Sequence, residues 1–270
     1  MKITIIIYII IFSFMLFLLM PMFFIALTSF KKYGEIVAGI IFPTTVTFEN
    51  YVNVLYAPGF RFLDFMINSI LIAAFSTLMS TIISFPAAYS IARFKTGGGT
   101  LSSYILSLRL LPPIIFALPI YILYHSINLV DTHIGLILIY TVFNIPLSIF
   151  VLKSFISDLP IELEEAALID GCSRVKIMTN IIFPLAMPGI IAVSILNFLA
   201  CWNEYLFALI LTFKKAATVN VAASLFVTAY AIKYGEIAAS VMIAMFPPIV
   251  FMFLVQRNLV RGLTLGAIKK

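Results

Sequence analysis

Acidic side chains gather in one short stretch of a chain that is otherwise very apolar. Five of the 11 Asp and Glu residues lie within residues 158–170, namely Asp158, Glu162, Glu164, Glu165 and Asp170. The chain carries no HExxH, GxSxG or CxxC pattern that would place these acids in a catalytic or metal site. Since so apolar a protein does not need this stretch for solubility, we interpret the acidic segment as a docking site for another protein.

The composition indicates a membrane protein. Hydrophobic residues make up 63% of the chain and charged residues 10%, with a mean hydropathy of +1.16, whereas a soluble domain carries about 25% charged residues. The net charge of +6 comes from basic residues scattered at span ends, which does not indicate nucleic-acid binding. Cys172 and Cys201 lie far apart and indicate neither a disulfide framework nor a metal cluster. We expect residues 1–270 to form a single transmembrane domain.

Six segments are long and apolar enough to cross a bilayer, which takes about 20 residues as a helix. They are roughly 4–28, 65–92, 103–124, 133–153, 185–211 and 237–257. The predicted fold class is therefore an all-α polytopic membrane protein with six transmembrane helices. The first segment exceeds the h-region of a signal peptide, about 7–15 residues, and Lys31 and Lys32 follow it, so we expect it to be retained as a span. Prolines such as Pro112 and Pro113 are expected to kink spans, either for packing or in helices that rock.

The distribution of Lys and Arg predicts the orientation. With the N-terminus inside, 11 of the 17 basic residues are cytoplasmic and six, Lys31, Lys32, Arg61, Lys214, Lys215 and Lys233, are outside. An excess of Lys and Arg marks cytoplasmic loops, which favours an N-in, C-in topology. Segment 29–64 is then extracytoplasmic, with a short helix over 47–55 capped by Thr47, and segment 153–183 is a cytoplasmic loop.

Two short helices are expected inside 153–183. The first would be capped by Asp158 and begin at Pro160, and Gly171 would end it because glycine adopts positive φ freely. Ser173 would cap the second helix. An apolar face of this helix is predicted from helical spacing, and its members are Val175, Met178, Ile181 and Ile182. A hairpin lying on lipid is the alternative, but anionic headgroups attract Lys and Arg and not acids.

One pattern resembles a known family. Glu165-Ala166-Ala167, Gly171 after three residues, Ile181 after nine more and then Phe183-Pro184 resemble the EAA loop of binding-protein-dependent ABC transporter permeases. The family usually has Leu where this chain has Phe183. Blocks 109–124, 128–155, 202–209 and 257–270 are similar to the carbohydrate-uptake, maltose-permease-like branch, so the resemblance covers most of 65–270.

The resemblance implies a multi-pass subunit of a prokaryotic plasma (cytoplasmic) membrane importer. Its partners would be a second permease subunit, a dimer of ATP-binding cassette ATPases, an extracytoplasmic sugar-binding protein and membrane lipid. ATP and Mg²⁺ would bind the ATPase, since no glycine of this chain is followed by the Lys of a phosphate-binding loop; no catalytic residue, cofactor or metal is expected in the chain itself. The implied docking positions are Glu162, Glu165, Ala166, Ala167, Asp170 and Gly171, with Glu165 as the polar contact.

Polar groups within spans are costly and usually face a cavity or the bundle interior. The candidates for contact with a sugar are Asn144, Asn197, Trp202, Asn203 and Glu204. Amide, carboxylate and aromatic groups suit a sugar, but Asn also forms interhelical bonds. Asn68 and Arg109 carry less weight, and His125 and His133 are expected to be polar surface residues without a metal.

The leading functional prediction is a sugar-importing ABC permease subunit, which is not itself an enzyme. The alternatives are the same permease with a glycerol-phosphate or polyol cargo and an ion-coupled secondary transporter. A phosphate cargo would favour Arg or Lys facing the cavity, for which only Arg109 is a candidate. Ion coupling would call for acids or bases near the membrane midplane, where Glu204 lies off-centre. A membrane-embedded enzyme lacks any supporting catalytic pattern.

Overall fold

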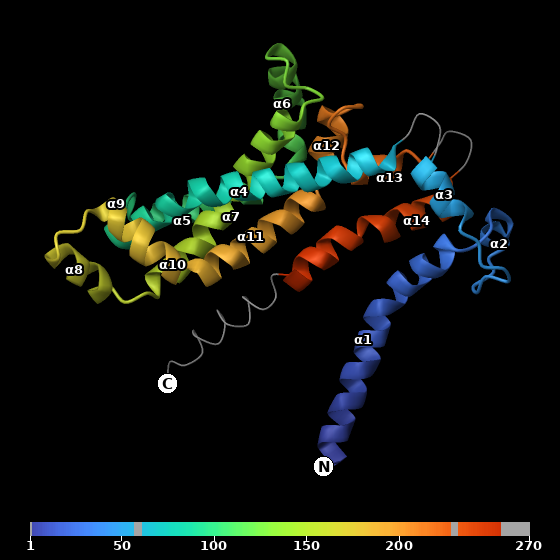
Figure 1. The fold of residues 1–270 in the computed structure, drawn as a ribbon, viewed down its shortest axis with the longest axis horizontal. Helices are drawn as coiled ribbons and strands as arrows, with labels where there is room; N and C mark the ends of the chain where they lie inside the picture. The colour runs from blue at the N-terminus through green and yellow to red at the C-terminus, as the bar shows by residue number, and fades with distance from the viewer. Residues whose placement is uncertain (1, 57–60, 228–231, 255–270) are drawn as a thin grey trace. The chain divides into compact units, whose positions relative to one another are not determined.

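The computed structural model describes residues 2–56, 61–227 and 232–254, and all the regular elements that follow are helices. The similarity block 257–270 and its basic residues therefore lie outside the described residues. Figure 1 shows the order of the elements along the chain. They are α1 (Lys2–Ser29), α2 (Tyr33–Val37), α3 (Glu49–Tyr56), α4 (Phe62–Phe94), α5 (Gly98–Ser107), the 3₁₀ turn η1 (Leu108–Leu110), α6 (Ile114–Ser126), α7 (His133–Ser157), α8 (Glu162–Ile169), α9 (Arg174–Ile177), the π-helical turn η2 (Met178–Ile182), α10 (Phe183–Leu185), α11 (Met187–Trp202), α12 (Leu206–Leu211), α13 (Val219–Ser224) and α14 (Tyr234–Ala244).

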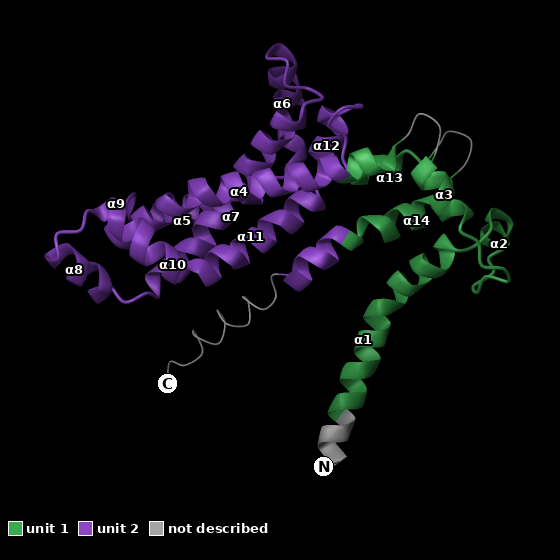
Figure 2. Ribbon diagram, viewed as in Figure 1, with its two compact units in different colours: residues 1–66, 219–246 green, residues 67–218, 247–270 purple. Residues whose placement is uncertain are grey.

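The helices group into two compact units, drawn in different colours in Figure 2. One unit comprises residues 1–66 and 219–246, and the other comprises residues 67–218 and 247–270. The expectation of one permease domain over the whole chain stays a prediction.

In the first unit, α14 packs against α1 and α3. Helix α3 begins at Glu49, where the Thr47 hydroxyl accepts a hydrogen bond from the Glu49 N–H at 3.2 Å. The buried Asn50 side chain ties this helix to the end of α1 by donating to the carbonyls of Ser29 and Lys31, each at 2.9 Å. The predicted short helix is thus present, but it runs from Glu49 to Tyr56, so Thr47 lies one position before the N-cap and binds the first helical N–H.

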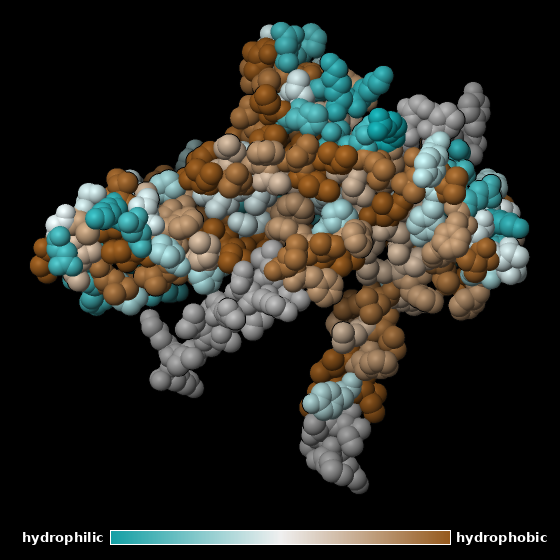
Figure 3. All heavy atoms as spheres, in the orientation of Figure 1, coloured by the Kyte–Doolittle hydropathy of each residue, from teal (hydrophilic) through white to brown (hydrophobic). Residues whose placement is uncertain are grey.

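The second unit contains the middle of the chain. Helix α7 packs against α11, α5 and α12, and α12 also contacts α6. In Figure 3, hydrophilic residues gather around α8 and α9 and at the tip of α6, while the intervening surface of α4 is mainly hydrophobic. This pattern matches a bundle whose middle faces hydrocarbon and whose ends face water.

Four described helices have the length and apolar composition to cross a membrane: Ile7–Ser29, Phe62–Phe94, His133–Ser157 and Tyr234–Leu254. The count reaches 6 if each of two bent helix pairs is one span. These pairs are Gly98–Leu110 with Ile114–Ser126, bent by 88°, and Arg174–Leu185 with Met187–Trp202, bent by 74°. The all-helical polytopic fold is therefore confirmed.

The third predicted span is not one straight helix. Its two halves meet at Leu111, which is extended (φ −70°, ψ 128°), directly before Pro112 and Pro113. A residue before proline is pushed out of the helical region, and proline lacks the N–H that would continue the helical bonds. The helix therefore breaks at these two prolines, and its halves are bent by 88° relative to each other.

The fifth predicted span, 185–211, is also interrupted. Helix α11 ends at Trp202, Asn203 forms its C-cap, and α12 starts at Leu206. The Glu204 carboxylate accepts hydrogen bonds from the N–H groups of Phe207 and Ala208, at 2.9 and 3.2 Å. This side chain therefore caps α12, which stabilises a new helix start in place of a continuous span.

Candidate docking site and polar core

The acidic loop between α7 and α11 contains two short helices, as predicted, but the first is capped differently. Asp158 is the C-cap of α7, and its N–H bonds to the Ser154 carbonyl. Helix α8 starts at Glu162 after Ile161, with no side-chain cap. The prediction that Asp158 caps α8 is thus wrong, because α7 runs on to Ser157. The three acids in the first turn of α8 still lie at the positive end of the helix, which stabilises them.

Helix α8 has one buried and one exposed face. Glu164 and Ala167, three residues apart, are 1% and 7% exposed. The opposite stripe of Glu162, Glu165, Ala166 and Ile169 is exposed, and Ile169 is exposed by 87%. Asp170 and Gly171 are also exposed. Of the predicted docking positions, Ala167 therefore points into the protein and the others are on the surface.

Gly171 makes the turn between α8 and α9. Its φ is +78°, its N–H bonds to the Leu168 carbonyl at 3.0 Å, and the Cys172 N–H bonds to the Ala167 carbonyl at 2.9 Å. This pair of bonds is the Schellman arrangement, which needs a left-handed residue after the helix and favours glycine. Ser173 then caps α9 by accepting the Lys176 N–H at 3.4 Å. Both assignments made from the sequence agree with the structure.

The apolar face of the second helix differs in part from the predicted one. Ile182 is fully buried and Met178 and Ile181 pack partly buried against the core, as predicted, but Val175 is exposed and Ile177 is buried instead. Ile177 and Ile182 pack in a core with Phe85 of α4 and Leu152 of α7. The π-helical turn over Met178–Ile182, whose hydrogen bonds join residues five apart, places Ile182 on the same face as Ile177.

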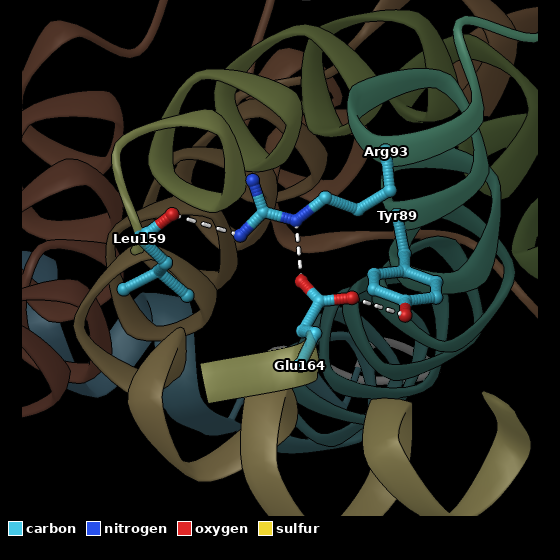
Figure 4. Close-up of polar contacts among 4 residues, drawn as sticks. All are labelled: Tyr89, Arg93, Leu159 and Glu164. Carbon is cyan, nitrogen blue, oxygen red and sulfur yellow. Dashed lines mark hydrogen bonds and ion pairs between the residues drawn. The ribbon is translucent and has the colours of Figure 1, made fainter. Parts of the chain in front are cut away.

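Glu164 belongs to a polar cluster that the sequence did not single out (Figure 4). Its carboxylate accepts hydrogen bonds from the Tyr89 hydroxyl, at 2.6 Å, and from the Arg93 Nε, with which it forms an ion pair. The Arg93 Nη2 also donates to the Leu159 carbonyl at 2.9 Å. The side chains of Arg93 and Glu164 are only 7% and 2% exposed. Among the acids of α8, Glu164 is thus an internal anchor.

Asn197 lies in the centre of the second unit and is 0% exposed. Its amide donates to the Ser80 hydroxyl of α4 at 2.9 Å and to the Ser148 hydroxyl of α7 at 2.8 Å. Asn144 of α7 is also buried and donates to the Tyr140 carbonyl and the Cys201 thiol. Both candidates for sugar contact therefore make bonds within and between helices.

The other three candidates lie at the break between α11 and α12. Trp202 is buried and stacks on Phe198, with ring centroids 5.9 Å apart. Asn203 is exposed and donates to the Leu199 carbonyl. Glu204 is half-buried and accepts the Tyr140 hydroxyl at 2.7 Å in addition to capping α12. Asn203 and Glu204 are thus the more accessible pair.

Asp131 organises the turn between α6 and α7. Its carboxylate accepts the four consecutive backbone N–H groups of residues 213–216 at 3.0 to 3.2 Å. Burial alone would raise the pKa of Asp131, but these hydrogen bonds lower the pKa below its usual value. Sequence reasoning could not find this cluster of donors, because they are backbone groups more than 80 residues away along the chain.

His133 is a structural neighbour of this turn. Its Nε2 lies 2.7 Å from the Oδ1 of Asn68, whose amide donates to the carbonyls of Lys215 and Ala217. His133 is half-buried, so its assignment to the surface is only partly right, whereas His125 is exposed. Across the described part of the chain, no three His, Cys, Asp or Glu side chains gather as metal ligands.

Long apolar helices, two bent helix pairs and a loop of short helices anchored to the bundle define a polytopic helical membrane protein. The chain belongs to the family of binding-protein-dependent transport system inner membrane components, whose model matches residues 80–265. It is therefore the permease subunit of an ABC importer, a multi-pass, non-catalytic component of the inner membrane. Membership of this family excludes the ion-coupled secondary transporter.

Relatives in several organisms are similar over nearly the whole chain. The trehalose transport system permease protein SugB of Mycobacterium tuberculosis is 37% identical, covering 93% of this chain and 92% of the relative. The trehalose/maltose transport system permease protein MalG of Thermococcus litoralis is 35% identical, covering 93% and 91%. A probable ABC transporter permease, y4oR of Sinorhizobium fredii, is 35% identical over 93% and 90%.

Solved structures support the fold. A chain of a bacterial ABC transporter involved in the import of the acidic polysaccharide alginate superposes with a TM-score of 0.75, covering 95% of this chain and 96% of that one, at 20% identity. A chain of the MetNI methionine ABC transporter, in an inward-facing conformation, gives a TM-score of 0.59 over 74% and 95%, at 13% identity. At these identities the likeness concerns the fold alone.

Proposed function

We propose that this permease imports a neutral sugar and that the exposed stripe of α8 docks on a partner ATPase. The observation that carries the docking proposal is the division of α8 into an anchored face and a free face. Its partners would be the ATPase dimer, which binds ATP and Mg²⁺, a second permease subunit and an extracytoplasmic sugar-binding protein.

The free face of α8 has the chemistry of a protein-docking surface. Ile169 projects a large apolar side chain that is 87% exposed, and Glu162 and Glu165 lie on the same stripe. A central apolar anchor with a polar rim is typical of protein interfaces. The acids favour a partner cleft with basic side chains. They disfavour anionic lipid, which attracts Lys and Arg.

The fixed turn at Gly171 adds to this proposal. Because the Schellman bonds and the Ser173 cap hold α8 and α9 in one arrangement, the docking face is already ordered before a partner binds. A preorganised surface loses less conformational entropy on binding. Under the predicted topology, this loop lies on the cytoplasmic side and segment 29–64 faces the sugar-binding protein.

The sugar cargo is supported by the relatives' names. SugB and MalG are named for trehalose or maltose transport, and SmoH of Agrobacterium fabrum, 31% identical, for sulfoquinovosyl glycerol transport. Within this chain, we propose Asn203 and Glu204 as the groups nearest the sugar pathway, since they are more accessible than Asn144 and Asn197. Trp202 would support them from its buried position.

The docking proposal is tested by co-purifying the chain with its candidate ATPase. Glu165→Ala and Gly171→Pro should each weaken recovery of the ATPase by about tenfold, equivalent to about 1.4 kcal/mol. Asp158→Asn is the control, because it removes an exposed carboxylate from the same loop outside the docking stripe. Wild-type recovery of the ATPase with both test variants would contradict docking through α8.

The cargo is tested by uptake into vesicles that contain the complete transporter. Uptake of each of four solutes, trehalose, maltose, a polyol and glycerol phosphate, is measured in turn while the others are added unlabelled as competitors. Competition by the disaccharides alone is expected for a neutral-sugar importer. Competition by glycerol phosphate or the polyol alone would transfer the proposal to that cargo class.

A further inference from the structure

Glu164, the neighbour of Glu165 on α8, points into the protein and not toward the exposed stripe. Glu165 is exposed, whereas Glu164 is 1% exposed and reaches the end of α4 (Figure 4). Its two carboxylate oxygens bind two donors, the Tyr89 hydroxyl and the Arg93 Nε. These donors are four residues apart and therefore lie on the same face of α4. One carboxylate thus fastens α8 to a full turn of a membrane-spanning helix.

The guanidinium of Arg93 extends this attachment. Besides Glu164, it binds the Leu159 carbonyl at 2.9 Å, in the turn that connects α7 to α8. The planar fork of arginine can hold two acceptors in a fixed geometry, which a lysine cannot reproduce. The end of α4, the α7–α8 turn and α8 therefore share one network of directional bonds.

A buried ion pair resists relative movement more strongly than an apolar contact does. If α8 slid along α4, a carboxylate or guanidinium that is 2% or 7% exposed would lose its partner without gaining water. Leaving one buried charge unpaired is strongly unfavourable. Apolar neighbours such as Ala167 and Phe85 carry no such directional restraint.

The same end of α4 also holds α9. The Arg174 guanidinium lies over the Phe94 ring, 5.3 Å from its centroid, and Phe94 packs edge-on against Tyr89. Further along α4, the Ser80 hydroxyl accepts the Asn197 amide of α11, and the Ser76 hydroxyl donates to the Ile137 carbonyl of α7. Contacts thus continue from the docking loop through α4 to the helices of the bundle core.

We propose that the Glu164–Arg93 ion pair makes α8 and the adjoining end of α4 move as one body, so that ATPase motion at α8 is passed to the membrane helices. Glu164 is then a positioning residue for transport and not a docking residue. The inference rests on the proposed docking of α8 on the ATPase, and the two can be tested separately.

The experiment compares Glu164→Gln and Arg93→Met with Asp158→Asn in the complete transporter, reconstituted with ATPase and binding protein. Glu164→Gln and Asp158→Asn make the same carboxylate-to-amide change in one loop, at a buried and an exposed position. We expect ATPase recovery within about twofold of wild type for all three. Solute uptake per ATP hydrolysed should fall at least about tenfold in the two test variants and stay unchanged in Asp158→Asn.

A double variant, Glu164→Met with Arg93→Met, guards against simple misfolding. It keeps the side-chain volume and leaves no buried charge, a change that is often neutral for stability. In complexes of equal composition and melting temperature, a purely structural role would leave uptake per ATP at the wild-type value, whereas a mechanical role predicts the same loss as in Glu164→Gln.

The outcomes separate the two proposals. Wild-type uptake per ATP in Glu164→Gln, or in the folded double variant, would overturn the mechanical link while leaving docking intact. Failure of the wild-type chain to bind the ATPase through α8 would instead overturn the docking proposal itself.

Discussion

Replacing Gly171 by alanine should weaken the docking loop through the backbone alone. The residue has a φ of +78°, and a Cβ added there would meet no atom within 4 Å. No side chain is displaced and no cavity is formed. The predicted effect is therefore the intrinsic cost of a left-handed conformation for an L-residue.

That cost is about 1–2 kcal/mol for alanine. It acts on the two Schellman bonds, from Gly171 N–H to the Leu168 carbonyl and from Cys172 N–H to the Ala167 carbonyl, because both require the left-handed turn. The ratio of closed to open turn should fall by a factor of about 5–30. The affinity for the ATPase should fall by no more than the same factor, since an ordered turn is a precondition of docking.

A series of substitutions gives the prediction its specificity. Asparagine tolerates the left-handed region better than other non-glycine residues, so Gly171→Asn should retain most of the affinity. Gly99→Ala is the matched control, because it is also open to solvent but has no positive φ. The assay is equilibrium binding of the purified ATPase to the permease in nanodiscs. Equal affinities for glycine and alanine at 171, or a similar loss in Gly99→Ala, would refute the backbone argument.

Four further substitutions test the polar and packing contacts of the second unit. Asp131→Asn should cost about 2 kcal/mol of stability, since hydrogen bonds to a charged group contribute about 1.5–3 kcal/mol. Because the folded pKa of this carboxyl is lowered, its contribution is complete above its unfolded pKa of about 3.9 and is lost as the pH falls through the folded value. The difference in melting temperature between wild type and variant should thus be constant near neutral pH and shrink only below about pH 4; a difference that changes around pH 7 would contradict this. Gly189→Ala should cost about 1–3 kcal/mol in thermal melts, because the added Cβ would collide with the Phe155 ring, and an unchanged melting temperature would show that the ring moves aside. Asn197→Ala should lower stability by about 1 kcal/mol with the apparent affinity for sugar unchanged, whereas Asn203→Ala should weaken that affinity without changing the melting temperature; the reverse pattern would exchange their roles.

The sequence determined the features that depend on neighbouring residues. Apolar stretches of sufficient length define the membrane helices, and Gly171 and Ser173 define a turn and a cap by their own conformational and hydrogen-bonding preferences. The EAA spacing also lies within one loop. Pro112 and Pro113 predict a kink, because their effect on the preceding Leu111 is local. The size of the bend between the two half-helices, 88°, depends on how both half-helices pack.

Which of two similar residues faces inward depends on the packing of distant helices. Glu164 and Glu165 are the same residue type at adjacent positions, but successive positions on a helix lie about 100° apart, and only Glu164 meets Arg93 of a distant helix. Packing against Phe85 and Leu152 of other helices likewise buries Ile177, whereas Val175 stays exposed. Such choices depend on partners supplied by remote parts of the chain, since a buried charge or amide is stable only where those partners are present. The spacing of residues along one helix therefore determines its local form, and the packing of other helices determines the role of each face.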